Sequence, residues 1–410
     1  MISRLFTHLL LEYLETFPVV AVVGSRQVGK STLVRQPIVG ASRRYRTLDD
    51  IAAFSVAQSD PKSFLDADVP LTIDEVQLVP SLLREIKLLV DGDRRAGRFL
   101  LTGSSDLDHG ADISSALAGR VGILRLPPIT LSEEHRATGW RHWMEAANTK
   151  RLDEVFAGHR YPPLPLERIV TGGYPDSLLA KTDRSRRLWM DSFRATYLER
   201  DLRRISDIGN LAEFARLMQL SAASTGGLLN QANLARDAGM SPATAGRYLS
   251  ILEASFLITR LPPFFANIGK RMVKAPKLFW NDTGLAAHLC GIPTAERLGA
   301  DSPLLGRMVE TLLMMEIQAL LPLADEPAHL FHVRTHDGLE VDGLLAVGNR
   351  HLPFEIKASR TVTASDATPM ERWIALNPRH GPGVVLYAGK DYQALSKNVR
   401  AIPATALFLR

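Results

Sequence analysis

The sequence has 410 residues, 46% of them hydrophobic and 23% charged, and a formal net charge of +5 at pH 7. A single core stops growing at about 250–300 residues, so this length predicts at least two domains. The single cysteine, Cys290, excludes an internal disulfide framework and a cysteine-based zinc finger, and it suits a reducing cytoplasm. No apolar run approaches the ~18–20 residues of a membrane span. We therefore expect a cytoplasmic protein with no membrane partner.

A glycine loop follows an expected amphipathic helix, which ends near Thr16, and an apolar strand at 19–23. Gly24 and Gly29 allow backbone angles that turn N–H groups towards phosphate oxygens. Lys30 would reach the β- and γ-phosphates, and the Ser31 hydroxyl would hold Mg²⁺. A glycine turn that binds nothing is the alternative, but the flanking elements favour an ATP site. The loop matches G-x-x-x-x-G-K-S without substitution: Gly24, Ser25, Arg26, Gln27, Val28, Gly29, Lys30, Ser31 and Thr32.

Further strands are predicted at 44–48, 71–75, 99–105 and 121–126, with helical patterns between them. This alternation indicates an α/β fold with a buried parallel sheet. Ligands of such sheets bind at the carboxyl ends of the strands. The strand at 71–75 ends in carboxylates and the strand at 99–105 ends in hydroxyls, so the ends of both strands are candidates for a site.

The carboxylates are Asp74 and Glu75, and the hydroxyls belong to Ser104 and Ser105. Asp74 would fix Mg²⁺ directly or through water, and Glu75 would polarise the attacking water. Binding alone needs only the first carboxylate, so the second favours hydrolysis. Ser104 or Ser105 could donate to the γ-phosphate or the water, although a plain turn is the alternative for the serines and a solvated strand end for the carboxylates.

Several motifs resemble a family of bacterial and archaeal AAA-type ATPases whose C-terminal domain, of unknown function, is similar to PD-(D/E)xK nucleases. The motifs are spread along the chain: Gly24–Thr32, Leu71–Glu75, Leu101–Ser105, Leu117–Val121, Gly172–Pro175 and Tyr197–Asp201. The resemblance implies an α/β multidomain protein with four parts. These are a P-loop ATPase core with a parallel sheet at 1–160, a helical lid or connector at 161–205, a winged helix at 206–290, and an α/β nuclease-like domain at 291–410.

The resemblance also implies subunit contacts. In related AAA proteins an arginine from a neighbouring subunit completes the ATP site, and Arg120 is the candidate here, so we expect a homo-oligomer. A salt bridge at a strand start is the alternative role for Arg120. An arginine-rich helical pattern at 185–205 is typical of a solvated, internally paired face, with a nucleic-acid or subunit contact as the alternative. Its bases are Arg186, Arg187, Arg194, Arg200, Arg203 and Arg204.

Residues 231–254 predict two helices joined by a tight turn at Gly239, with Ser241 capping the second helix. The strand-like run 256–261 then suggests a wing, and the shape is that of a winged helix. DNA contact is possible for such a module but packing is an alternative use, and Arg247 is the one exposed base expected on the recognition helix. Phosphate contact would come mostly from basic residues near the return of the wing. They are Lys270, Arg271, Lys274 and Lys277.

Three strands are predicted near the C-terminus, at 329–334, 339–347 and 350–357. If Gly348 and Asn349 form a hairpin turn, Val347 pairs with Arg350. The same register sets Asp342 opposite Glu355 and Glu340 opposite Lys357, all on one face. Opposed carboxylates repel unless a cation lies between them.

The nucleases that this region resembles hold a divalent metal, Mg²⁺ or Mn²⁺, on such carboxylates. The matching ligands here are Asp342, Glu355 and Glu310, and Lys357 would orient water or stabilise charge. Val341 stands where the nuclease motif has proline. The alternative is a binding-only domain with a surface ion pair between Glu340 and Lys357. The neighbouring His329, His332, His336 and His351 lack a paired helical spacing and are expected to be ordinary surface residues.

The leading hypothesis is therefore an ATP-binding and ATP-hydrolysing AAA-type protein that acts on or near nucleic acid through a nuclease-like C-terminal domain. The alternative is a nucleotide-switched regulator that binds DNA or a protein partner, in a toxin–antitoxin or defence setting, with a catalytically silent C-terminal domain.

Overall fold

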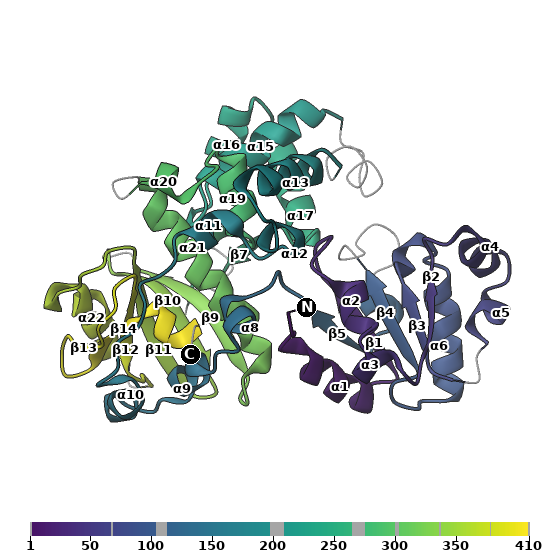
Figure 1. Ribbon diagram of the computed structural model, residues 1–410, viewed down its shortest axis with the longest axis horizontal. Helices are drawn as coiled ribbons and strands as arrows, with labels where there is room; N and C mark the ends of the chain where they lie inside the picture. Colours follow the sequence, from purple (N-terminus) through teal and green to yellow (C-terminus); the bar gives the residue numbers. More distant parts are fainter. Residues whose placement is uncertain are drawn as a thin grey trace. The chain divides into compact units, whose positions relative to one another are not determined.

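The computed structural model describes residues 2–66, 69–103, 113–196, 209–264, 275–299, 303–335, 338–377 and 379–408. Within these ranges the chain forms two compact units, coloured along the sequence in Figure 1. The N-terminal unit comprises residues up to Ile129 together with 250–257. The second unit comprises 130–196, 209–249 and 258–408.

The N-terminal unit is an α/β fold around a five-stranded sheet in the order β2-β3-β4-β1-β5. Every strand pair in it is parallel, so each connection must cross over the sheet. The strands are β1 (Val19–Val23), β2 (Arg44–Thr47), β3 (Leu71–Asp74), β4 (Phe99–Gly103) and β5 (Val121–Arg125). The helices are α1 (Phe6–Thr16), α2 (Lys30–Val34), α3 (Pro37–Gly40), α4 (Ile51–Ser59), α5 (Pro61–Leu65), the 3₁₀ turn η1 (Val76–Leu78), α6 (Leu82–Gly92) and α7 (Ile113–Ala116).

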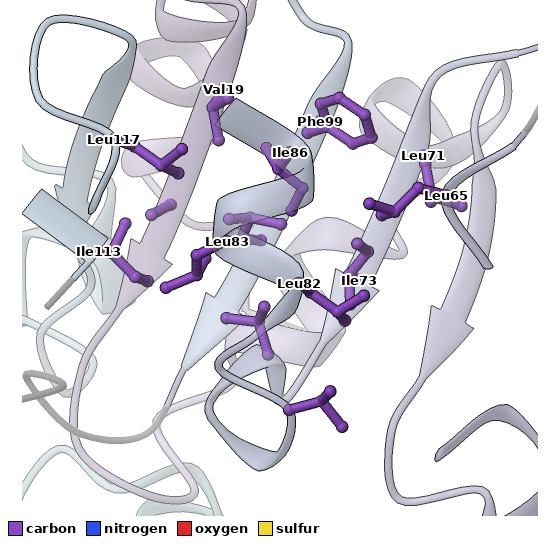
Figure 2. Close-up of a cluster of buried hydrophobic side chains, with 14 of the residues drawn as sticks. Val19, Leu65, Leu71, Ile73, Leu82, Leu83, Ile86, Phe99, Ile113 and Leu117 are labelled. Atoms are coloured by element: carbon purple, nitrogen blue, oxygen red, sulfur yellow. The ribbon is translucent and has the colours of Figure 1, made fainter. Parts of the chain in front are cut away.

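The core of this unit explains why its strands read as continuous apolar runs. All residues of β1 and β4 are buried, as expected for strands covered on both faces. The amphipathic helix α6 turns Leu83 and Ile86 towards Ile73 and Phe99, and Figure 2 shows these side chains in one cluster. The glycine loop follows β1, and because the strands are parallel, the carboxyl ends of the other strands lie at the same end of the sheet as the loop.

The second unit contains a largely helical segment with a small antiparallel sheet, ordered β6-β8-β7. The predicted pair of helices is present as α16 and α17, and Gly239 between them has a φ of 74°. The elements are α8 (Leu131–His135), α9 (Gly139–Glu145), α10 (Thr149–Phe156), α11 (Glu167–Thr171), α12 (Pro175–Leu178), α13 (Asp183–Thr196), α15 (Leu211–Ala223), β6 (Gly227–Leu228), α16 (Gln231–Ala238), α17 (Pro242–Ala254), β7 (Ile258–Leu261), β8 (Lys277–Trp280), α19 (Thr283–Leu289) and α20 (Ala295–Leu298). The last turn of α17, from residue 250, is assigned to the N-terminal unit.

The same unit contains a six-stranded mixed sheet in the order β13-β14-β12-β11-β10-β9. The hairpin between β10 and β11 has the predicted register, with Val347 opposite Arg350. Helix α22 packs Met370 and Trp373 onto one face of the sheet. The elements are α21 (Pro303–Leu320), η3 (Leu321–Leu323), β9 (Ala328–Arg334), β10 (Glu340–Val347), β11 (Arg350–Lys357), η4 (Ala364–Ala367), α22 (Thr368–Leu376), β12 (Gly383–Tyr387), β13 (Gln393–Ala394), β14 (Val399–Pro403) and α23 (Ala404–Phe408).

Residues 130–160 differ from the expectation that the ATPase core extends to residue 160. They form α8, α9 and α10, which belong to the second unit. Asp153 on α10 accepts two hydrogen bonds from the Arg400 guanidinium, at 2.7 and 3.0 Å. The Trp143 ring packs edge-on against Phe354 with 5.3 Å between centroids. The sequence could not reveal this assignment because the partners are more than 200 residues away.

One predicted strand ends earlier than expected: β3 stops at Asp74, and Glu75 follows it with a φ of 60°. Strand β4 is described as far as Gly103, and Ser104 and Ser105 lie outside the described residues. The arginine-rich helix is described as far as Thr196. Its bases Arg200, Arg203 and Arg204, the motif 197–201, and the wing residues Lys270, Arg271 and Lys274 lie outside the described residues, as does His336. Among the helices that the structure describes, none has the length and apolar character required to cross a bilayer.

The packing of α6 predicts how strongly the N-terminal core depends on it. The Ile86 side chain is fully buried, so Ile86→Ala leaves a cavity and is expected to lower the free energy of unfolding by about 2–5 kcal/mol. Leu88 on the same helix is 62% exposed, so Leu88→Ala is the matched control, with an expected change within about 0.5 kcal/mol. Urea unfolding of both variants measures the difference, and equal midpoints would contradict this description of the core.

Candidate functional site

The glycine loop between β1 and α2 has a backbone that only glycine permits at two positions. A Cβ atom on Gly24 would lie 2.4 Å from the carbonyl oxygen of Leu126, far inside contact distance. Gly29 has a φ of 95°, which side chains disfavour. Successive N–H groups in such a loop form a concavity that binds anions. The loop therefore has the local geometry that a phosphate site requires.

The Lys30 side chain is buried beneath this loop. Its Nζ donates to the carbonyl oxygens of Gly24, at 2.9 Å, and Ser25, at 2.8 Å. Burial lowers the pKa of Lys30 to about 8, although the charges of Glu75 and Asp74 oppose the shift. The lysine thus provides a positive charge at the loop, and this charge is lost at moderately alkaline pH.

Asp74, at the end of β3, accepts hydrogen bonds from three other elements. The Ser31 hydroxyl of α2 donates to its Oδ1 at 3.1 Å, and the Tyr45 hydroxyl of β2 donates to its Oδ2 at 2.5 Å. The Thr102 hydroxyl of β4 also donates to Oδ1. Carboxylate and hydroxyl oxygens are the ligands that Mg²⁺ prefers, so Ser31 and Asp74 fit a nucleotide-bound Mg²⁺ at this edge of the sheet.

Glu75 is held next to Asp74 in a left-handed backbone conformation, with a φ of 60°. Its N–H donates to the Thr102 hydroxyl at 3.1 Å, and its carboxylate accepts a hydrogen bond from Gln77. Burial raises the pKa of Glu75 above its ordinary value, against the opposing effects of Gln77 and Lys30. Non-glycine residues in this conformation are uncommon and cluster at functional sites.

The structure brings together the predicted Gly24, Lys30, Ser31, Asp74 and Glu75. It does not bring Arg120 to them, because Arg120 precedes β5 and the loop follows β1. These strands are parallel, so the two lie at opposite edges of the sheet. The Arg120 guanidinium instead donates to both carboxylate oxygens of Asp91, at 2.6 and 3.0 Å. Ser104 lies outside the described residues.

A second cluster of charged side chains lies in the second unit. It contains the predicted Glu310 on α21, Asp342 on β10, and Glu355 and Lys357 on β11. Lys357 Nζ lies 3.4 Å from Glu355 Oε2, and Asp342 Oδ2 accepts the N–H of Ile356 at 2.9 Å. Burial and the charge of Asp342 raise the pKa values of Glu310 and Glu355 above their ordinary values.

Lys277 on β8 also enters this cluster. Its Nζ lies 2.9 Å from Glu310 Oε1, 3.4 Å from Asp342 Oδ1 and 3.8 Å from Glu340 Oε1. Burial alone would lower the pKa of Lys277, but the charges of Asp342 and Glu310 raise it. The expectation that Lys277 is an exposed wing residue that contacts phosphate is therefore wrong, because its side chain is buried against carboxylates.

Known proteins resemble the chain along most of its length. Two curated relatives, uncharacterized protein Rv2008c of Mycobacterium tuberculosis and uncharacterized protein Mb2031c of Mycobacterium bovis, are each 32% identical to it over 390 residues. The aligned part covers 94% of this chain and 80% of each relative. The chain belongs to the family of these two proteins.

Family models divide this family member into three parts. Residues 16–135 match a model described as an AAA domain, 164–296 match a domain of unknown function (DUF8612), and 305–407 match another (DUF4143). The N-terminal unit is thus an AAA-type P-loop ATPase domain. Among solved structures, the Walker-type ATPase PABY2304 of Pyrococcus abyssi is 14% identical with a TM-score of 0.43, covering 70% of this chain and 96% of that chain. AMPPCP-bound DnaA of Aquifex aeolicus is 15% identical with a TM-score of 0.25, covering 61% and 87%.

The carboxylate cluster of this family member does not fit the divalent metal expected there. Over the described ranges, no three His, Cys, Asp or Glu side chains are arranged to hold one ion. The physical reason is that the Lys277 ammonium already lies between Glu310 and Asp342. The expectation for the histidines is also wrong at His332, which is buried, and burial lowers its pKa to about 4.

The sequence did not predict Tyr45 and Thr102 as partners of Asp74. Thr102 lies within the motif Leu101–Ser105, and a hydroxyl at the end of a predicted strand indicates a polar site there. Thr47 pairs with Asp74 on the neighbouring strand, and Tyr45 lies two residues before Thr47. Because side chains alternate with period two along a strand, Tyr45 lies on the same face of the sheet as Thr47. That inference needs the adjacency of β2 and β3, which the sequence does not contain.

The close approach at Gly24 predicts the effect of adding a methyl group. Gly24→Ala must displace the backbone at Leu126, and we expect ATP affinity to fall by at least about ten-fold, equivalent to ~1.4 kcal/mol. Gly92, at the end of α6, has no atom within 4 Å of the corresponding Cβ position, so Gly92→Ala is the control. Titration with a fluorescent ATP analogue measures both. Unchanged affinity in Gly24→Ala would show that the loop does not bind phosphate.

The pKa of Lys30 predicts a pH dependence of nucleotide binding. In the free protein the ammonium loses its proton as the pH rises through about 8. Above that pH, binding an anion must restore the proton, so affinity falls by up to about ten-fold per pH unit and binding takes up a proton. Below that pH, this group contributes no dependence. Calorimetry at pH 9 in buffers of different ionisation enthalpy measures the uptake. Lys30→Met should bind weakly with no uptake from this group, and equal uptake in both proteins would contradict the assignment.

Proposed function

We propose that this protein hydrolyses ATP with Mg²⁺ and that its C-terminal half binds a partner without cutting nucleic acid. The observation that carries the ATPase proposal is the pairing of Ser31 with Asp74 directly beside Glu75. When bound, Mg²⁺ would neutralise phosphate charge and orient the nucleotide, and Ser31 and Asp74 would hold it. Lys30 would add its charge to the β- and γ-phosphates.

Glu75 is the proposed base for the attacking water. Its raised pKa supports this role, because a more basic carboxylate accepts a proton more readily. The water oxygen would bond to the γ-phosphorus while the bond from that phosphorus to the β–γ bridging oxygen breaks. The products are ADP and phosphate, and the proton from the water passes to Glu75. Ser104 remains a proposed donor to the γ-phosphate or the water.

Homo-oligomer formation is part of the proposal. Arg120 lies at the sheet edge opposite the loop of its own subunit, so it could serve only the nucleotide of a neighbouring subunit. Its two hydrogen bonds to Asp91 would have to open for that role. If they stay closed, Arg120 is a structural residue, and an oligomer would need a different contact.

The binding role of the C-terminal half corresponds to a nucleotide-switched regulator. The Lys277 ammonium inside the carboxylate cluster favours this function over metal-dependent cleavage by Asp342, Glu355 and Lys357. The helices α15 to α17 and the sheet β6-β8-β7 support a winged-helix assignment. Exposed Arg247 on α17 is a candidate phosphate contact, so the partner is either DNA or a protein. DNA would be favoured if the protein retains DNA, if this retention falls with rising salt, and if the Asp342→Ala variant retains DNA as the wild type does.

The role of Glu75 predicts a separation of binding from turnover. Glu75→Gln removes the base and keeps the side-chain size, so ATP turnover should fall by about 10²–10⁴-fold while ATP binding persists. Exposed Glu12 on α1 gives the control Glu12→Gln, which should turn over ATP like the wild type. Phosphate release with Mg²⁺, with and without DNA, measures the rates. Wild-type turnover no higher than that of Lys30→Ala would sink the proposal.

A further inference from the structure

The carboxylate cluster of the second unit contains its own cation. Lys277 Nζ forms ion pairs with Glu310 and Asp342, and the residue is only 4% exposed. Glu340 lies further out, 3.8 Å from the same nitrogen and 3.6 Å from Arg334 Nη1. The inner carboxylates thus share a buried ammonium, which comes from a different sheet of the same unit.

The backbone holds Lys277 firmly in this place. Strand β8 is the central strand of its sheet, and Lys277 pairs with Leu228 on one side and Leu261 on the other. The turn before β6 is also tied to α21, because the Thr225 and Thr311 hydroxyls lie 2.9 Å apart. The Lys277 side chain therefore extends from a fixed strand, unlike a side chain on a loose loop.

A divalent ion that bridges Glu310 and Asp342 cannot share this place with the Lys277 ammonium. Mg²⁺ and Ca²⁺ lie about 2.0–2.6 Å from their oxygen ligands, so an ion bridging Glu310 and Asp342 would overlap the nitrogen that contacts both oxygens. Repulsion between the two like charges at such a distance would be severe. The second oxygen of Asp342 already accepts the Ile356 N–H, and Glu355 has Lys357 beside it.

We infer that Lys277 is the resident cation between Glu310 and Asp342, so that the wild-type protein binds no divalent metal on these two carboxylates. The ammonium neutralises buried carboxylates that would otherwise repel one another, and it ties β8 to α21 and β10. This inference concerns the second unit alone and does not depend on ATP hydrolysis in the first.

The test is a Mn²⁺ titration of nucleotide-free, full-length protein, with free Mn²⁺ followed by electron paramagnetic resonance. Lys277→Ala removes the ammonium and leaves the carboxylates with space for an ion. We expect this variant to bind about one more Mn²⁺ per chain than the wild type, and Lys277→Ala combined with Asp342→Asn to lose it. Any Mn²⁺ at the glycine loop is common to all these proteins and cancels in the comparison.

Lys357→Ala is the matched control, because it removes the other ammonium of the cluster and leaves Lys277 in place. It should gain no Mn²⁺. A folded Lys277→Ala protein that binds no additional Mn²⁺ would overturn the inference. If Lys277→Ala does not fold, wild type and Asp342→Asn decide the matter. Equal Mn²⁺ binding by these two supports the inference, and an ion bound by the wild type but lost in Asp342→Asn overturns it.

Discussion

The nucleotide site depends on the hydrogen bonds that the Asp74 carboxylate accepts. A buried carboxylate is costly unless it is hydrogen-bonded, and Asp74 meets this requirement with hydroxyl donors from α2, β2 and β4. These bonds fix Ser31 relative to the end of β3, and the Thr102 hydroxyl that donates to Asp74 also accepts the N–H of Glu75. The hydrogen bonds of one buried carboxylate thus set the positions of Ser31 and Glu75, the groups proposed to hold Mg²⁺ and to activate water.

The second unit stabilises its buried carboxylates in a different way. Hydroxyl donors satisfy the lone pairs of Asp74 and add no positive charge, so the carboxylate still fits the proposed Mg²⁺. At Glu310 and Asp342 an ammonium satisfies the lone pairs and cancels charge as well. Removing one partner of a buried ion pair is strongly destabilising, so the Lys277 pair is also a structural contact. Two clusters of acidic side chains can therefore look alike in sequence and differ in what they bind.

The features predicted from the sequence depend on neighbours in the chain. The glycine loop, the strand before Asp74 and the hairpin with Val347 opposite Arg350 all follow from local spacing and period-two alternation. The missed features depend on contacts between distant segments, such as Tyr45 with Asp74 and Lys277 with Glu310. Gly172 illustrates the gap, because only the resemblance singled it out. A Cβ there would lie 2.4 Å from Asp282 Oδ1, and Asp282 also accepts the Gly173 N–H, so glycine is required by a partner 110 residues away.

These contacts also define how the second unit can move. Lys277 pairs with Glu310, Thr225 with Thr311, and the Arg307 guanidinium donates to the Ala223 carbonyl at 3.0 Å, so β8, the end of α15 and α21 are joined at several points. The Phe264 N–H donates to the His332 carbonyl at 2.7 Å, which joins the segment after β7 to β9. Separating the helical segment from the six-stranded sheet would expose unpaired buried charges, a cost of several kcal/mol. We therefore expect the helical segment and the six-stranded sheet to move together in any rearrangement of this unit.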